Sequence, residues 1–194
     1  MLSRARISIN IDDVVKGLDK KKENSRKVVE RTVNEMRSMP PKISKVVRKE
    51  YTINKADFDS SMHIQKMGGI NIGGHVVDNI SIIYKGRLLT LTHFKFSPHS
   101  RPAKKYKVKT TIKKGNKRTL NNRTFIAHSH GEGSKSLPFQ RDRGVAQTPI
   151  RAVRTLSAPQ MVQDGKGNTK PEIENLINEN LEKRFKHHCD HLLK

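Results

Sequence analysis

The feature that most constrains the fold is a long stretch of positive charge with no acidic residue to balance it. Residues 79 to 131 contain thirteen lysines and arginines and not one aspartate or glutamate. A solvated protein surface normally mixes both signs. The imbalance therefore indicates a surface selected against negative charge, which would suit an anionic partner. The alternative is a basic face that serves solubility alone.

Residues 104 to 114, KKYKVKTTIKK, show how such a segment can still fold. Successive side chains of a β-strand point to opposite faces of the sheet. A strand here would turn Tyr106, Val108, Thr110 and Ile112 to one side and a row of lysines to the other. We predict that this row faces a DNA channel or another anion. Its members are Lys105, Lys107, Lys109 and Lys113.

The whole composition points the same way. The chain has 194 residues, 33% of them hydrophobic, and a formal net charge of +22. That length and apolar content fit one modest domain. Nucleic acid is the usual partner of so basic a chain, and an acidic protein surface comes next. Cys189 is the one cysteine, so no intrachain disulfide can form. We expect no signal peptide and no membrane span, since no apolar run is long enough.

Apolar residues at helical spacing predict two helices near the start of the chain. The first covers residues 11–38, and Pro40 and Pro41 end it, because proline clashes with the preceding helical turn. The second covers 41–51. Residues 1–54 are therefore predicted to form an N-terminal helical segment.

The middle of the chain is rich in β-branched residues and predicts antiparallel strands. Residues 76–84 and 87–96 are expected to pair as a hairpin around Lys85-Gly86, a two-residue connection with a glycine. Further short strands are predicted at 123–127, 136–142 and 148–155.

These strands are predicted to form a sheet body over residues 55–160, with a long loop at 128–147. The glycine-rich stretch MGGINIGGH, residues 67–75, is interpreted as a flexible loop. It lacks the lysine-serine ending of a phosphate-binding P-loop.

The clearest helix is predicted at 169–193, within a C-terminal segment 161–194 that packs on the body. Thr169 and Glu172 have the spacing of a capping box. Leu181 and Phe185 are expected to anchor its apolar face. The fold class is α+β, with N-terminal helices, a central basic antiparallel sheet or small sandwich with long loops, and a C-terminal amphipathic helix. That apolar face comprises Ile173, Leu176, Ile177, Leu181, Phe185, His188 and Leu192.

The stretch HSHGEGSKSLPFQRDRG raises the possibility of a metal-dependent nuclease. His128 and His130 lie two residues apart, and Glu132 and Asp142 follow. Such an enzyme needs a full ligand set with an acid or base in a strand-turn-helix frame. Here prolines and a short extended stretch follow the histidines instead. We therefore favour a solvated loop over a metal site.

A second cluster of metal-ligand types stands at the end of the last helix. His187 and His191 are spaced i and i+4, a spacing that can hold a metal, and His188 and Cys189 lie between them. Cations near a helix C-terminus are also favoured by the helix dipole, which is the simpler explanation. Nothing in the pattern supplies a base for Cys189. We predict no catalytic residue, no metal and no cofactor.

Four segments taken in order resemble the prophage minor tail protein Z family. They are VVRKEYTINKADF (46–58), ISIIYKGRLLTLTHFKFSP (80–98), FIAHSHGEGSKSLPFQRDRG (125–144) and TPIRAVRTLSAPQM (148–161), and the match in order and spacing covers roughly residues 25 to 190. The most telling piece is SAPQM ahead of a helix.

The resemblance implies a structural virion protein that completes a phage tail at its head-proximal end, as one subunit of a ring, six-fold by analogy, around the DNA. The partners it implies are tail terminator, tail tube and neck or connector proteins, with packaged DNA held by non-specific electrostatics. The protein would be assembled in the host cytoplasm. Phe139 would tuck inward as a structural anchor, and Arg141 and Arg143 would meet a neighbouring subunit or the tail tube.

Two other hypotheses remain open at this stage. A monomeric basic nucleic-acid-binding protein fits the composition, although the sheet shows no paired exposed aromatics of the kind that stack on RNA bases. A metal-dependent nuclease would act through His128, His130 and Glu132.

Overall fold

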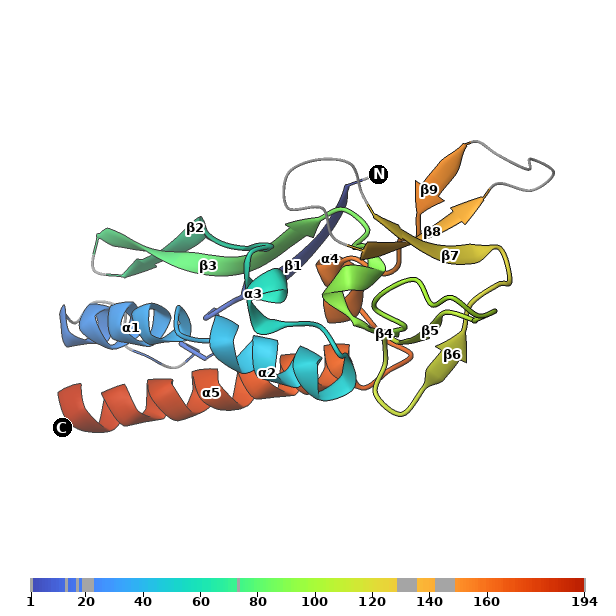
Figure 1. Ribbon diagram of the computed structural model, residues 1–194. Coiled ribbons are helices and arrows are strands. Elements are labelled where there is room, and N and C mark those ends of the chain that lie inside the picture. Colours follow the sequence, from blue (N-terminus) through green and yellow to red (C-terminus); the bar gives the residue numbers. More distant parts are fainter. Residues whose placement is uncertain are drawn as a thin grey trace.

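The computed structural model describes residues 2–12, 14–16, 18, 23–72, 74–128, 136–141 and 149–193. It is an α+β structure with antiparallel sheets and a C-terminal helix, so the predicted fold class is confirmed. The molecule is elongated, with a sheet backed by helices in one part and two small sheets projecting from the other (Figure 1). We call these parts the body and the projecting sheets.

The body is built on a three-stranded antiparallel sheet in the order β1-β3-β2. The strands are β1 (Ser3–Ile9), β2 (Met62–Ile72) and β3 (His75–Gly86). Strand β3 matches the predicted strand at 76–84, but the predicted hairpin with 87–96 is wrong. Both edges of β3 are already occupied, by β1 on one side and β2 on the other. Residues 87–96 instead leave the sheet through a short 3-10 helix, η1 (Leu91–His93).

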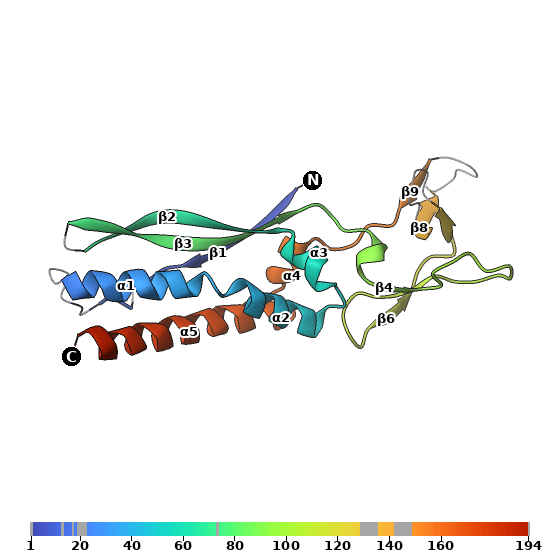
Figure 2. The same cartoon turned by 60° about the vertical axis from the view of Figure 1, so that its left-hand side comes forward.

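Five α-helices accompany this sheet among the described residues, and all lie on one side of it (Figures 1 and 2). In both views α1 and α5 run side by side along the sheet, and α2 follows α5 toward the projecting sheets. The helices are α1 (Glu23–Met36), α2 (Pro40–Glu50), α3 (Lys55–Asp59), α4 (Ala158–Val162) and α5 (Thr169–Leu192).

The start of the chain differs from the prediction of a helical segment over residues 1–54. Residues 3–9 form strand β1, whose alternate residues Ala5 and Ile9 are buried. Of the predicted helix 11–38, the structure shows α1 over Glu23–Met36. The described residues between β1 and α1 form turns, yet Ile11 and Val15 are buried in them. Helix α2 lies within one residue of its predicted bounds.

The glycine-rich stretch 67–75 is part of a β-hairpin rather than a flexible loop. Gly74, with φ of +81°, lies at the turn between β2 and β3, in a conformation that glycine adopts without steric cost. Gly69 lies against the facing strand, and a Cβ on it would come within 1.9 Å of the Val77 carbonyl oxygen. The pairing register shifts between Met67 and Ile70, so the glycines accommodate a bulge.

The projecting sheets consist of short strands. One sheet has the order β4-β5-β6, with β4 (Lys95–Ser97), β5 (Lys109–Thr111) and β6 (Lys117–Thr119). The other has the order β7-β8-β9, with β7 (Thr124–His128), β8 (Ser136–Arg141) and β9 (Ile150–Ala152). The predicted short strands at 123–127, 136–142 and 148–155 are confirmed, with β9 narrower than expected. The predicted strand 104–114 is reduced to the three residues of β5.

The core of the protein lies in the body and is mostly aliphatic. Helix α5 contributes Ile173, Ile177 and Leu181, with Phe185 partly buried beside them. The predicted C-terminal helix and its apolar face are thus confirmed. Its predicted capping box is not, because Asn168 is the N-cap and no side chain bonds the first turn. A capping box forms instead at α4, where Ser157 and Gln160 bond each other's backbone N–H groups.

None of the described helices combines the length and the apolar character needed to cross a membrane.

Candidate nucleic-acid interface

The predicted lysine row is presented by the first projecting sheet. Lys105, Lys107 and Lys109 are exposed, whereas the intervening Val108 is fully buried and Thr110 nearly so. The alternation of burial therefore follows the predicted pattern even where the segment is not a regular strand. We call residues 95–119, which hold this row and strands β4 to β6, the basic arm.

Pairing of β5 with β4 and β6 places further lysines on the same face of the sheet as Lys109. Lys95 and Lys117 both lie opposite Thr111 in the register. Because Lys109 and Thr111 are two residues apart on β5, all three lysines share one face. The arm is held to β7 by the Ile126 backbone N–H, which donates to the Tyr106 hydroxyl at 2.8 Å. A cationic face without a neighbouring carboxylate attracts phosphates irrespective of sequence.

Lys113 does not belong to this row, which corrects its predicted role. Its ammonium group forms an ion pair and hydrogen bond with Asp164 and lies 5.4 Å from the centre of the Tyr51 ring. The side chain therefore points back to the body rather than to a DNA channel.

Asp164 is the centre of a junction between the body and the basic arm. Its carboxylate accepts hydrogen bonds from the Tyr51 hydroxyl and from Lys113, and the Gly167 backbone N–H donates to it at 2.9 Å. These donors hold the pKa of Asp164 far below its usual range. Burial, followed by the hydrogen bond to Asp164, raises the pKa of Tyr51. No local sequence pattern reveals this junction, because Tyr51 and Lys113 lie 113 and 51 residues from Asp164 along the chain.

The second projecting sheet holds the remaining predicted contact residues that the structure describes. Phe139 is half-buried and stacks on Phe125 with ring centres 6.3 Å apart, while the adjacent Pro138 is buried. The Arg141 guanidinium lies 5.2 Å from the centre of the Phe125 ring. Arg141 therefore rests on its own sheet, where cation–π attraction steadies it. Arg143 lies outside the described residues.

The described residues offer no support for a metal centre at the histidine-rich loop. Nδ1 of His128 lies 3.5 Å from the Ser136 hydroxyl. His130, Glu132 and Asp142 lie outside the described residues. Across the part of the chain that the structure describes, no three histidine, cysteine, aspartate or glutamate side chains gather closely enough to hold a metal ion.

The second histidine cluster is explained by helix packing. The rings of His187 and His191 meet edge to face on α5, with ring centres 4.5 Å apart. His188 is buried and its Nε2 lies 3.2 Å from a carboxylate oxygen of Glu35 on α1. Burial raises the pKa of the Cys189 thiol, the reverse of what activates a nucleophile.

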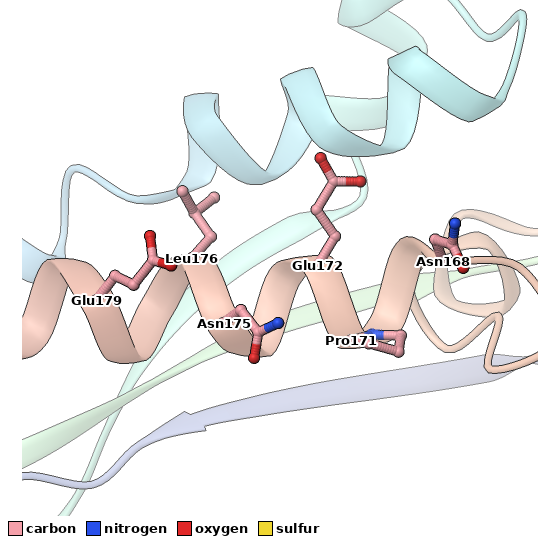
Figure 3. Close-up of a pocket in the computed structure, with 6 residues that line it drawn as sticks. All are labelled: Asn168, Pro171, Glu172, Asn175, Leu176 and Glu179. Carbon is pink, nitrogen blue, oxygen red and sulfur yellow. The ribbon is translucent and has the colours of Figure 1, made fainter.

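A shallow depression of about 500 Å³ lies along the start of α5, beside the end of α2 (Figure 3). Glu172 on its rim is engaged by Lys49 of α2, with 2.9 Å between Nζ and Oε1. Its lining contains no nucleophile and no histidine, so it has the chemistry of a groove between packed helices rather than that of an active site. The lining residues are Asn168, Pro171, Glu172, Asn175, Leu176 and Glu179.

Comparison of the chain with models of known families, with curated proteins and with solved structures found no match in any of the three.

Proposed function

We propose that this protein is a structural subunit of a phage or phage-like tail. It would act as a tail completion or minor tail protein in a ring at the head-proximal end, with its basic arm toward the packaged DNA. The observation that carries the proposal is the basic arm itself, an acid-free segment with exposed lysines that projects from a helix-backed body.

The proposed mechanism rests on attraction between lysines and DNA phosphates, repeated in every copy of a ring. Phosphate contacts by lysine release counterions from DNA and are independent of base sequence. In a closed ring each copy adds its own Lys105, Lys107 and Lys109, so the lumen becomes positive on all sides. The body, whose residues 169–194 are neutral with five basic and five acidic side chains, is available for contacts with neighbouring copies and with tail tube, terminator and neck proteins.

A second candidate function is a monomeric basic nucleic-acid-binding protein. The same basic arm favours it, because a projecting cationic sheet could bind a duplex without any ring. The two candidates differ in what the isolated chain does. The first requires assembly into a closed oligomer, alone or on tail partners, and the second requires tight salt-dependent binding by the monomer.

The first experiment combines native mass spectrometry with charge reversal of the arm. We expect the unmodified chain to form a metal-free closed ring, with six copies as the leading expectation. The variant Lys105→Glu, Lys107→Glu, Lys109→Glu should keep its melting temperature, since exposed substitutions change stability by about 0.5 kcal/mol or less. It should still form rings, but particles carrying it should lose packaged DNA.

The matched control reverses three exposed lysines on the helices, Lys45, Lys183 and Lys186, and so makes the same change in net charge. Normal DNA retention in the arm variant, or equal loss in a control that still forms rings, would refute the role of the arm. A chain that stays monomeric even with tail proteins, yet binds DNA tightly, would establish the second candidate instead.

A further inference from the structure

The body sheet has a second face, which no described helix covers. In both views the described helices lie on one side of the β1-β3-β2 sheet, and none of them lies on the other side (Figures 1 and 2). The core residues Ile80, Ile82 and Tyr84 point to the helix side, so the alternate residues of β3 point away from it. We call this side the outer face. By register it carries Arg4, Arg6 and Ser8 of β1, Ser81, Ile83 and Lys85 of β3, and His63 and Gln65 of β2.

Among the described residues, the cations of the outer face have no acidic partner. Arg4, Arg6 and Lys85 are exposed, and none of them forms an ion pair with a carboxylate of the residues that the structure describes. Elsewhere on the same sheet, Lys66 of β2 pairs with Asp78 of β3 at 3.2 Å. The outer face is therefore a local excess of positive charge.

The register brings these cations close together. Arg4 lies opposite Lys85, and Arg6 lies opposite Ile83, which is flanked on its other side by His63. Residues two apart on a strand are separated by about 7 Å. Two rows of side chains thus hold three permanent charges and a histidine within a small area.

The next row contains a polar group without a partner. Ser81 lies between Ser8 and Gln65 in the register and is 0% exposed. Its hydroxyl makes no hydrogen bond within the part of the protein that the structure describes. A buried hydroxyl without a partner costs roughly 1–3 kcal/mol. A ligand oxygen that reached this row, by displacing the exposed side chains beside it, would relieve that cost.

We propose that the outer face binds the phosphate backbone of a nucleic acid. Unpaired arginine and lysine side chains and neutral hydroxyl and amide groups are the groups that contact phosphate and sugar oxygens in protein–DNA complexes. The face holds no aromatic residue other than His63, so base stacking contributes little and the binding is independent of sequence. A lipid surface fits less well, because Ile83, the apolar residue at the centre of the face, is only 1% exposed.

This site is distinct from the basic arm and needs no ring. The arm belongs to the projecting sheets, whereas the outer face lies on the body sheet (Figure 2). A duplex on the outer face would run along the body, in addition to any DNA that the arm contacts. The inference therefore goes beyond the proposed function and can hold whether or not the chain belongs to a tail.

The test measures binding of the full chain to a random-sequence DNA duplex as a function of salt. The slope of the logarithm of the DNA-binding constant against log salt is negative. In the variant Arg4→Ala, Arg6→Ala, Lys85→Ala its magnitude should fall by about two to three, because each phosphate neutralised contributes about 0.9. The matched control, Lys45→Ala, Arg48→Ala, Lys183→Ala, removes the same charge from exposed positions on the helices and should leave most of the slope in place.

A second variant, Ser81→Ala, separates a binding role from a structural one. It should leave the melting temperature unchanged or raise it, since an unpartnered hydroxyl is removed, and should still weaken DNA binding several-fold. The proposal is overturned if the outer-face variant and the helix control lose binding equally. It is also overturned if the outer-face variant loses binding to anionic phospholipid vesicles while its DNA binding is unchanged. If only the arm variant fails to give its expected result, the proposed function is refuted and the proposal for the outer face is unaffected.

Discussion

The body and the projecting sheets are held together in different ways. The body encloses the core cluster, to which β1, β3 and the helices α1, α2, α4 and α5 all contribute apolar side chains. In the projecting sheets, Val108 and Ile126 are buried but lie outside that cluster, and four of the six strands have only three residues. The comparison indicates that the body supplies most of the stability of the chain. The projecting sheets are held by a few buried contacts, so most of their side chains can be charged without loss of a core.

The largest expected effect comes from removing core volume in the body. Leu181→Ala should lower the free energy of unfolding by about 2–5 kcal/mol, because Leu181 is 4% exposed within the core cluster. Ile126→Ala in β7 is the matched change outside the cluster. We expect it to loosen the second projecting sheet with a smaller loss of global stability, measured by chemical denaturation. Equal losses would contradict the division into two differently stabilised parts.

A smaller effect is expected from a single methyl group in the β2-β3 hairpin. Gly69→Ala should destabilise the protein by about 1–3 kcal/mol, since the new Cβ would overlap the Val77 carbonyl group and the backbone would have to move. Gly68→Ala is the control, because a Cβ at Gly68 meets nothing within 4 Å. Thermal unfolding of the two variants would test this, and indistinguishable melting temperatures would argue against the close approach of the strands.

The junction at Asp164 is the anchor whose loss should affect the arm first. Asp164→Asn should cost roughly 1–3 kcal/mol at neutral pH, because the Lys113 ammonium loses its partner. The pKa of Asp164 is lowered in the folded protein, so its contribution is fully present above the unfolded value near 4 and is lost as pH falls. The difference between the two proteins should therefore narrow below about pH 4.

Limited proteolysis would show which part of the molecule is destabilised by Asp164→Asn. Cleavage within residues 95–119 should increase in Asp164→Asn before the body is affected. The control Asp59→Asn removes the partly exposed partner of Lys55, a surface pair that contributes little to stability. If cleavage increased equally in the body, Asp164 would be part of the core rather than an anchor of the arm.

The elements that the sequence predicted well are those specified by their own residues. Helix α5 follows from a long apolar period of three to four, and β3 from a run of β-branched residues. Strand β1 was missed although Ala5, Ile7 and Ile9 alternate in SRARISI, a signal that was present. The hairpin of 76–84 with 87–96 was wrong because strand pairing depends on competing partners, here β1 and β2, that are distant in sequence.

In the candidate nucleic-acid interface, too, local patterns were predicted and contacts between distant residues were not. Exposure of Lys105, Lys107 and Lys109 follows from local alternation, and the sequence predicted it. Lys113 shares the alternation, but its environment is set by Asp164, which no local period reveals. The outer face was likewise invisible, because it joins residues near positions 5, 64 and 83 that only the sheet register brings together.

The register of β1 also has a consequence for the order of events during synthesis. Ser3 pairs with Gly86 and Ile9 with Ile80, and the core that covers this strand includes Ile173 and Leu181 of α5. The first strand must therefore wait for some eighty residues to emerge before it can pair, and for nearly the whole chain before it is covered. The short hairpin of β5 and β6, joined at Gly115, can close long before the body that supports it.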